Sequence, residues 1–328
     1  MDAFDYDLPE GSIAQEPAEP RDAARLLVAT DPAGEVRHLR VRDLSDLLFP
    51  GDVLVVNDSR VMPARLLLHK PTGGKVEVLL LEPLDAEAGW WEALVRPGRK
   101  VSPGTRLGSG GTEVVEVGER REHGTRRVRL LADVAGLGSV ALPPYIRRPL
   151  RDPERYQTVY AARPGSVAAP TAGLHLTHEL LRRCRQRGVE VRGLELAVGL
   201  GTFRPVVADE PGDHVIHSER YRVPAPTMDA CRAARRVVAV GTTTVRALEA
   251  AAATGELAGR TSLFIRGEHP FRVVDVLLTN FHQPRSSLLL LLGAFCGDRW
   301  RSLYELALAD RYRFLSFGDA MLVSRRAS

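Results

Sequence analysis

Val237-Val238-Ala239-Val240-Gly241 is an apolar run that leads directly into Thr242-Thr243-Thr244 and the helical pattern Val245–Ala253. A short apolar run followed at once by a helix is typical of a buried strand in a βα unit. We therefore predict an α/β domain with a largely parallel sheet. The same alternation recurs at Val189–Val198 and at Val273–Thr279, which runs into Ser287–Phe295.

A second kind of pattern interrupts this domain between about Leu66 and Leu142. Glycine and proline turns separate short strand candidates there, which is typical of a small antiparallel barrel or sandwich. One strand candidate of the α/β domain, Val53–Val56, lies before the interruption. We therefore predict a discontinuous α/β domain over residues 1–65 and 143–328, with a β-domain inserted at 66–142. The short strand candidates are Lys75–Val78, Trp91–Val95, Thr112–Val117 and Arg126–Leu130.

The composition is that of a globular protein, with 44% apolar and 26% charged residues in a chain of 328. The longest apolar run, Leu288–Phe295, is too short to cross a bilayer, and the acidic N-terminus carries no secretion signal. Cys184, Cys231 and Cys296 are odd in number and far apart, so they form neither a disulfide framework nor a C-x-x-C metal site. We expect a cytoplasmic protein that does not bind membranes.

Polar stretches follow the predicted strands at four places. In α/β sheets ligands gather at the carboxyl ends of the strands, so we expect these stretches to form a site. Gly199-Leu200-Gly201 lacks the third glycine of a dinucleotide fingerprint, and Gly241-Thr242-Thr243-Thr244 lacks the lysine of a P-loop. We therefore do not predict phosphate transfer. The four stretches are Asn57–Arg60, Gly199–Arg204, Gly241–Arg246 and Thr279–Arg285.

A fifth polar stretch, Pro170–Thr177, precedes a helical pattern with Leu180, Leu181 and Cys184 on one face and Gly188 at its end. Thr177 is the predicted N-cap of this helix, and His175 lies just ahead of it. Free backbone N–H groups and the helix dipole favour anionic or polar ligands at such a position.

Two histidines and a carboxylate occur together in His214–Glu219. In a strand, His217 and Glu219 share one face, which suits a proton-transfer pair better than a complete zinc shell. We predict no metal.

A cluster of arginines near two tyrosines is a candidate RNA contact, because RNA recognition combines cations with aromatic faces. The net charge of +4 permits such a partner. The cluster comprises Arg147, Arg148, Arg151 and Arg155 around Tyr145 and Tyr156.

Short blocks that resemble a known family are spread over the whole chain. They are Phe4–Pro9, Asn57–Val61, Leu142–Ile146, Pro170–His175, Val198–Pro205, His217–Glu219, Val240–Thr244, Leu278–His282 and Tyr312–Met321. In these blocks, and in their order, the chain resembles the S-adenosylmethionine:tRNA ribosyltransferase-isomerases of queuosine biosynthesis. It departs from the family's usual sequence at Arg266–Pro270, which replaces a Tyr-Pro-Gly turn, and at Gln283–Arg285, which replaces Leu-Pro-Lys.

The resemblance implies an α/β barrel-like main domain that carries an inserted antiparallel β-barrel. It also implies that S-adenosylmethionine is consumed as a ribosyl donor, without a metal. The acceptor it implies is 7-aminomethyl-7-deazaguanine at the tRNA wobble position, and the products are epoxyqueuosine in tRNA, adenine and methionine. We expect the protein to act as a monomer.

The implied chemistry suggests roles for particular side chains. Histidine titrates near neutrality, so His175, His217 and His282 are acid/base candidates, and Glu219 or Asp58 is a candidate to orient or deprotonate the amine. Arg60, Arg246 or Arg285 is expected to pair with the methionine carboxylate in a bidentate manner. The remaining candidates for binding S-adenosylmethionine are Thr171, Gly173, Thr202, Thr242, Thr243, Thr244 and Asn280.

Two alternatives remain at the level of sequence. A diverged relative would act on a free deazapurine or another RNA, which the altered Arg266–Pro270 stretch allows. A non-catalytic RNA-binding protein would use the β-domain and the Tyr145–Tyr156 segment, and it would release no adenine from S-adenosylmethionine.

Overall fold

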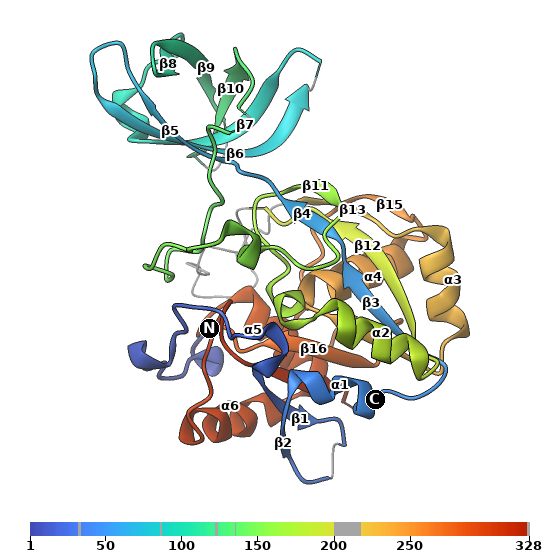
Figure 1. Cartoon of the computed structure of the whole chain (residues 1–328). Coiled ribbons are helices and arrows are strands. Elements are labelled where there is room, and N and C mark those ends of the chain that lie inside the picture. Colours follow the sequence, from blue (N-terminus) through green and yellow to red (C-terminus); the bar gives the residue numbers. More distant parts are fainter. Residues whose placement is uncertain (32–33, 86, 122–123, 135, 200–217, 327–328) are drawn as a thin grey trace. The chain divides into compact units, whose positions relative to one another are not determined.

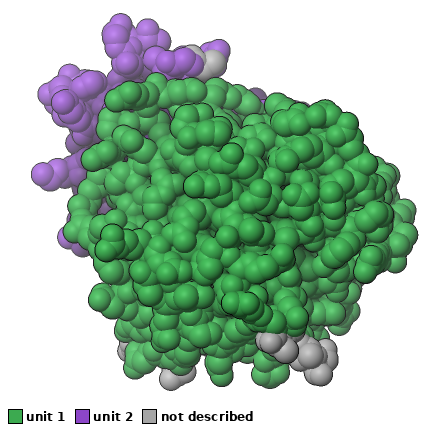
Figure 2. Space-filling view, turned by 60° about the horizontal axis from the view of Figure 1, so that its bottom comes forward, with its two compact units in different colours: residues 1–60, 144–163, 169–328 green, residues 61–143, 164–168 purple. Residues whose placement is uncertain are grey.

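The computed structural model describes residues 1–31, 34–85, 87–121, 124–134, 136–199 and 218–326. They form two compact units, which Figure 2 colours separately: unit 1 comprises residues 1–60, 144–163 and 169–328, and unit 2 comprises residues 61–143 and 164–168. Unit 2 therefore interrupts unit 1 in the chain. Its second segment, 164–168, has no counterpart in the sequence pattern.

Unit 1 contains a nine-stranded sheet in the order β15-β13-β12-β3-β14-β16-β17-β1-β2 (Figure 1). The centre is parallel, because β3 pairs in parallel with β12 and β14, and β14 with β16. Its strands are β1 (Arg25–Ala29), β2 (Arg37–Arg40), β3 (Asp52–Asn57), β12 (Glu190–Leu196), β13 (Glu219–Arg222), β14 (Arg236–Val240), β15 (Ala258–Thr261), β16 (Val276–Asn280) and β17 (Ala320–Ser324).

The α/β class is confirmed, and the sheet is mixed where the sequence predicts a largely parallel one. Strands β13, β15 and β2 add in antiparallel fashion, and β17 runs antiparallel to β16. The described strands of this sheet are ordered from β15 to β2. The antiparallel strands are four or five residues long, too short for a reliable sequence pattern.

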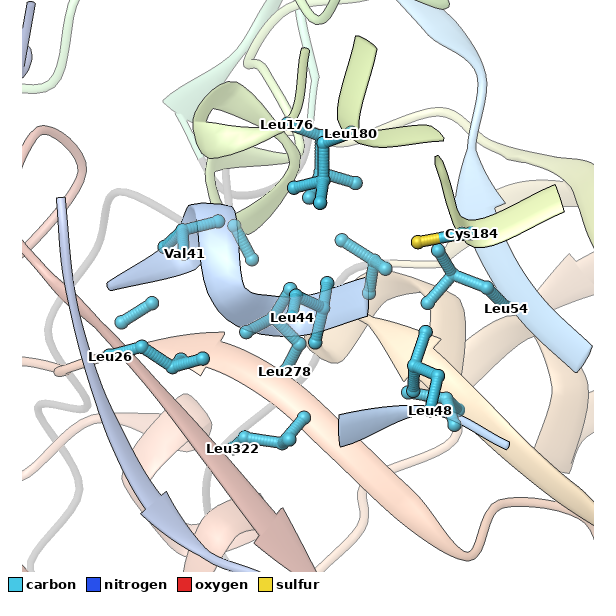
Figure 3. Packing of buried hydrophobic residues seen from close by; sticks show 14 of the residues in the cluster. Leu26, Val41, Leu44, Leu48, Leu54, Leu176, Leu180, Cys184, Leu278 and Leu322 are labelled. Atoms are coloured by element: carbon cyan, nitrogen blue, oxygen red, sulfur yellow. The ribbon is translucent and has the colours of Figure 1, made fainter. Parts of the chain in front are cut away.

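The core of unit 1 explains the apolar runs within the central strands β3, β14 and β16. All six residues of β3 are buried. Alternate residues of these strands, among them Leu54 and Leu278, pack with α1 (Leu44–Leu47), α2 (His178–Gln186) and the segment before α2. Leu180 of α2 belongs to the same cluster (Figure 3). Strands covered on both faces are expected to be apolar at every position.

The helix predictions are confirmed in this unit. Thr177 caps α2 through its side chain, Leu180, Leu181 and Cys184 are buried, and Gly188 follows the helix with φ of +79°. The α-helices are α1 (Leu44–Leu47), α2 (His178–Gln186), α3 (Ala225–Ala233), α4 (Thr242–Thr254), α5 (Ser287–Cys296) and α6 (Arg299–Ala309). The 3-10 helices are η1 (Asp2–Phe4), η2 (Glu10–Ser12), η3 (Arg21–Ala23), η4 (Val41–Asp43), η5 (Gly98–Lys100), η7 (Pro153–Tyr156) and η8 (Thr171–His175). None of the helices in the described ranges has the length and apolar content needed to cross a membrane.

Unit 2 contains a closed antiparallel barrel in the order β10-β7-β6-β5-β8-β9, which confirms the inserted antiparallel barrel. Its strands alternate between buried and exposed residues, as in β5, where Leu66 and Leu68 enter the barrel core. They are β5 (Arg65–His69), β6 (Lys75–Asp85), β7 (Trp90–Arg96), β8 (Arg106–Ser109), β9 (Thr112–Arg120) and β10 (Arg126–Leu130). The short strands β4 (Ser59–Val61) and β11 (Arg163–Ser166) pair with each other.

Candidate active site

The carboxyl ends of four neighbouring strands lie along one edge of the sheet in unit 1. Strands β12, β3, β14 and β16 are adjacent and parallel, with Leu194 opposite Asn57, and Val240 opposite both Val56 and Leu278. The polar stretches that follow these strands therefore meet at this edge, which we call the polar edge. Ligands of α/β proteins gather at such an edge.

Asp319 brings two further segments to the polar edge. Strand β17 runs antiparallel to β16, with Ala320 opposite Asn280, so β17 begins where β16 ends. One carboxylate oxygen of Asp319 accepts the backbone N–H of Arg25 at 2.9 Å, and the other accepts that of Arg313 at 2.8 Å. The buried carboxylate thus anchors the start of β1 and the loop before β17.

Asn280 connects Thr171 and His175 in a buried hydrogen-bond network. The Thr171 hydroxyl donates to Asn280 Oδ1 at 2.9 Å, and Asn280 Nδ2 lies 3.0 Å from His175 Nε2. Asn280 and His175 are only 3% and 4% exposed. Since Asn280 Nδ2 carries the protons, His175 Nε2 is the acceptor, and the proton of the neutral imidazole is on Nδ1.

The environment of His175 favours the neutral imidazole. Its pKa is lowered to about 4, mainly by burial and in addition by the nearby cations Arg313 and Arg21. Arg21 is held in place by the carbonyl of Leu174 at 3.1 Å. A small cavity of about 10 Å³ lies beside the imidazole, and Ser316 contributes to its lining. His175 is therefore uncharged at neutral pH and surrounded by positive charge.

Gly173 allows a tyrosine hydroxyl to approach the backbone of η8. A Cβ atom at this position would lie 1.9 Å from Tyr160 Oη and 3.0 Å from Thr158 Cγ2. Both Tyr160 Oη and Thr158 Oγ1 are buried and have no hydrogen-bond partner among the described residues. Buried polar atoms in proteins are normally paired, so such a pair of atoms is typical of a site that receives polar ligand groups.

Asp58 follows β3 and is a third group at this place with a polar atom that lacks a hydrogen-bond partner among the described residues. Its Oδ1 has no hydrogen-bond partner in the described ranges and lies 3.7 Å from the Arg163 guanidinium. Burial raises the pKa of Asp58, Arg163 opposes this shift, and the Glu195 carboxylate adds to it. The Asp58 carboxylate also raises the pKa of Tyr160, although burial is the larger cause. Asp58 and Tyr160 are therefore electrostatic neighbours.

The first turn of α4 lies at the same edge, next to Asn57. Gly241 has a φ of +86°, which glycine adopts without strain, and no side chain caps the helix. The buried Asn57 amide donates to Thr243 Oγ1 at 3.3 Å. The Thr244 hydroxyl donates to the carbonyl of Val240 at 2.7 Å, so it serves the helix itself.

Glu219 and Arg246 form a buried ion pair beside the end of β12. Arg246 lies 2.5 Å from one Glu219 oxygen, and the backbone N–H of Gly199 donates to the other at 2.9 Å. Arg246 also donates to the carbonyls of Leu263 and Thr261 at 3.0 and 3.2 Å. Burial raises the pKa of Glu219, while Arg246 and the Gly199 N–H oppose the shift. Both carboxylate oxygens are thus engaged in holding β12 and α4 together.

His282 and Arg285 have other partners. His282 Nε2 lies 3.0 Å from Thr279 Oγ1, and burial lowers its pKa to about 3. Thr279 and Asn280 are consecutive strand residues, so their side chains point to opposite faces of the sheet. Arg285 lies 3.4 Å from Asp2. The predicted acid/base group His282 is therefore on the face opposite the Asn280–His175 network.

The predicted RNA-binding arginines are paired with the N-terminal segment. Arg147, Arg148 and Arg155 contact Glu10, Glu16 and Glu19 at 2.5, 3.4 and 3.1 Å. The two tyrosines differ in exposure. The Tyr145 hydroxyl bonds Ser316 at 2.7 Å and its side chain is half-buried, whereas Tyr156 is fully buried against Phe317. Tyr156 therefore offers no aromatic face to a ligand, while Arg151 is exposed.

Arg60 makes an ion pair of 2.6 Å with Glu154 of η7, whose backbone carbonyl accepts from Arg21 at 2.9 Å. It therefore lies in a chain of contacts that reaches the segment next to His175. Two candidates, His217 and Thr202, lie outside the described residues. No group of three or more metal-ligating side chains occurs in the described ranges.

Several residues of the polar edge were not predicted as site residues. Asn57 and Asp319 lie in two of the sequence blocks that resemble the family, Asn57–Val61 and Tyr312–Met321, so the sequence could have identified them. Tyr160, Thr158 and Arg21 had no such signal, because only folding brings them to η8.

Comparisons with known proteins point to one family. The family model for queuosine biosynthesis protein matches residues 1–323. The S-adenosylmethionine:tRNA ribosyltransferase-isomerase of Thermus thermophilus is 53% identical, over 98% of this chain and 99% of that protein. That of Symbiobacterium thermophilum is 49% identical, over 98% of each. The crystal structure of S-adenosylmethionine tRNA ribosyltransferase from Thermotoga maritima is 38% identical and matches with a TM-score of 0.57, over 98% of this chain and 99% of that one.

The family model covers nearly the whole chain, and relatives about half identical align from end to end. The chain belongs to the queuosine biosynthesis protein family.

Proposed function

We propose that this protein is an S-adenosylmethionine:tRNA ribosyltransferase-isomerase. The observation that carries the proposal is the end-to-end match to relatives of that name. The polar edge supports it, because the sequence blocks shared with the family supply the Asn280–His175 network and the start of α4. The protein acts on tRNA with S-adenosylmethionine as its second substrate.

The proposed reaction moves the ribosyl group of S-adenosylmethionine to 7-aminomethyl-7-deazaguanine at the tRNA wobble position and isomerises it to give epoxyqueuosine. A base removes a proton from the 5′ carbon, which the adjacent sulfonium acidifies. The exocyclic amine attacks in its neutral form, and adenine and methionine leave. We assign no metal to any step. We propose that the enzyme is cytoplasmic and acts as a monomer.

The methionine carboxylate of the substrate is assigned to the first turn of α4. Thr242 and Thr243 supply backbone N–H groups at an uncapped helix N-terminus, where the dipole favours an anion. Thr171 and Gly173 are assigned to the same substrate, through the η8 backbone beside this turn. The Thr244 hydroxyl is engaged with Val240, so its part is to shape the helix start.

Asp58 is the proposed base. Its pKa is raised by burial against the opposing effect of Arg163, and Oδ1 has no hydrogen-bond partner among the described residues, nor do the Tyr160 and Thr158 hydroxyls. A carboxylate with a raised pKa is a stronger proton acceptor than an exposed one. The two hydroxyls are assigned to polar groups of the ribose.

His175 is the proposed hydrogen-bond donor of the site. A pKa of about 4 makes it a weak base at neutral pH, whereas the Nδ1 proton of the neutral imidazole is available to a substrate acceptor. Asn280 orients the ring. This role replaces the proton transfer expected from the residue type alone.

Glu219 and Arg246 are proposed as positioning residues, because each carboxylate oxygen of Glu219 already has a partner. His282 and Arg285 are assigned no step, since His282 bonds Thr279 and Arg285 lies next to Asp2. The arginines at 147, 148, 151 and 155, with Arg60, remain a proposed contact for the anticodon arm, in which the RNA phosphates replace the glutamate partners.

The test is adenine release from S-adenosylmethionine, measured with tRNA that carries 7-aminomethyl-7-deazaguanine and with the same tRNA lacking it. The proposal predicts adenine release only with the modified tRNA. Release with the free deazapurine alone would favour the diverged-relative alternative. RNA binding without any adenine release would contradict the proposed function.

A further inference from the structure

We propose that a groove on the outer strands of the unit 1 sheet binds RNA phosphates, in addition to the arginines assigned above. The groove has a volume of about 490 Å³, and its lining residues come from β12, β13 and β15. These three strands are neighbours at one end of the sheet (Figure 1). Its lining includes Arg220, Arg222 and Arg260, together with one carboxylate, Glu195. This inference rests on the proposed function, because it names the surface through which the RNA substrate is held.

The strand register places the three guanidinium groups on one face. Arg220 and Arg222 alternate with the buried Glu219 and Tyr221, so their side chains point outward together. Arg260 of β15 lies directly opposite Arg220 in the antiparallel ladder. Directly opposite side chains lie on the same face, with their Cβ atoms roughly 5 Å apart.

Two arginines at directly opposite positions oppose folding, because like charges at such positions repel. The neighbouring Glu195 carboxylate offsets this repulsion only in part. Glu195 Oε1 lies 3.7 Å from Arg220, and the side chain of Arg220 is still 51% exposed. A surface that gathers positive charge in this way is complementary to a polyanion.

The geometry of Arg260 indicates that the groove is organised. Its Nε donates to Ser218 Oγ at 3.1 Å, and its second nitrogen donates to the Ser218 carbonyl at 2.8 Å. The guanidinium is thereby held at the rim instead of moving freely. Fixed arginine forks match the oxygens of a phosphate, and they bind it more strongly than a flexible lysine does.

RNA is the partner that the charges favour. The groove is lined from three strands, and its cations Arg220 and Arg222 lie two residues apart on β13, roughly 7 Å along the strand. Phosphate contacts position a nucleic acid without reading its sequence. The groove also adjoins the Glu219–Arg246 pair through the inward-facing residue Glu219 of the same strand, so an RNA bound here passes beside the polar edge.

The experiment measures the dissociation constant for an unmodified tRNA transcript at several salt concentrations, in wild type, Arg222→Gln and the double variant Arg220→Gln/Arg222→Gln. Loss of each phosphate contact should reduce the salt slope of log K by about 1. We expect the dissociation constant to rise about three- to tenfold for each arginine removed. Arg222→Lys should retain the slope, because it retains the charge.

Arg232→Gln is the matched control, because Arg232 is an exposed arginine of unit 1 that pairs with Asp229 on its own helix α3. It should leave the salt slope unchanged. Wild-type affinity and slope in the double variant, or an equal loss in Arg232→Gln, would overturn the proposal.

The experiments distinguish a groove that does not bind RNA from a protein that lacks the proposed activity. Adenine release with the modified tRNA tests the function and needs no variant. Wild-type protein that releases adenine, with a double variant of unchanged salt slope, would leave the function standing and refute the groove. A reduced slope without adenine release in wild type would support the groove and refute the function.

Discussion

The barrel of unit 2 and the sheet of unit 1 place their polar side chains differently. The barrel interior is built from apolar residues such as Leu66, Val78 and Val128. At the carboxyl ends of the unit 1 strands, by contrast, buried polar residues gather, among them Asn57, His175 and Asn280. Burying a polar group opposes folding unless it is hydrogen-bonded, so a concentration of such groups at one edge indicates a function beyond stability.

Most of these groups are satisfied by one another, as in the Thr171–Asn280–His175 network. The unpaired hydroxyls of Tyr160 and Thr158 and the Asp58 carboxylate are the exception. The difference between the two regions therefore separates a scaffold that stabilises itself from a surface arranged to receive a substrate.

The largest expected effect on stability comes from truncating the barrel core. Leu66 is fully buried, so Leu66→Ala should lower the free energy of unfolding by about 2–5 kcal/mol. Urea denaturation measures this loss. At a temperature where the variant is folded, adenine release at saturating tRNA should stay near wild type. A large loss of turnover with unchanged stability would show that the barrel core takes part in the reaction.

The buried histidines of unit 1 should make its stability depend on pH. The pKa of His175 is about 4 in the folded protein and 6.5 ordinarily, so at pH values between them the unfolded chain binds a proton that the folded protein does not. The stability contributed by neutral His175 is present above about pH 6.5 and is lost as the pH falls towards 4, by about 3 kcal/mol. His282, with a pKa of about 3, acts in the same direction.

Urea denaturation at pH 7 and pH 4.5 checks this dependence. His175→Gln should show a shallower loss of stability than wild type, and His69→Gln on the exposed face of β5 should keep the wild-type profile. An identical pH dependence in wild type and His175→Gln would contradict the burial of a neutral imidazole.

Gly173→Ala should lower turnover strongly, because the added Cβ would meet Tyr160 Oη at 1.9 Å. Displacing groups of an active site by about 1 Å can cost roughly 100-fold in rate. Gly98→Ala in unit 2 is the matched control, since a Cβ there has no atom within 4 Å. The same clash should also destabilise Gly173→Ala. The double variant Gly173→Ala/Tyr160→Phe, which lacks the Tyr160 hydroxyl, should regain part of that stability. Full turnover in Gly173→Ala would rule out a close packing of η8 against Tyr160 in the working enzyme.

The smallest effect is expected from Asn280→Asp. The aspartate keeps an acceptor for the Thr171 hydroxyl but loses the donor to His175 Nε2, and its charge should raise the pKa of His175. We expect a loss of about 1–3 kcal/mol in the free energy of unfolding. NMR titration of the imidazole measures the pKa, and an unchanged value would mean that Asn280 does not orient the ring.

Much of the fold followed from apolar patterning. Strand β10 has the predicted bounds, and β3, β14, α4 and α5 differ from prediction by one to a few residues at their ends. The antiparallel strands β13, β15 and β17 were missed, because four or five residues carry too little periodicity. Strand β17 inserts between β16 and β1, a pairing between distant segments that local sequence does not encode.

The site was predictable where its residues follow strands. Asn280, Asp58 and Thr243 come from such stretches, and the sheet register brings the strand ends together. His175 comes from the polar stretch that precedes α2. The role of His175 was not predictable, because residue type says nothing about burial, and burial lowers its pKa. The position of His282 was not predictable either, because it bonds Thr279, whose side chain points to the face opposite that of Asn280.

We propose that the polar edge of unit 1 carries out the reaction with Asp58 as its base. The most direct test is single-turnover adenine release by Asp58→Asn beside wild type, with binding of S-adenosylmethionine measured in parallel. We expect a rate lower by about 100-fold or more, with binding retained, because general base catalysis contributes factors of this order. A near-normal rate in Asp58→Asn, with binding intact, would contradict it.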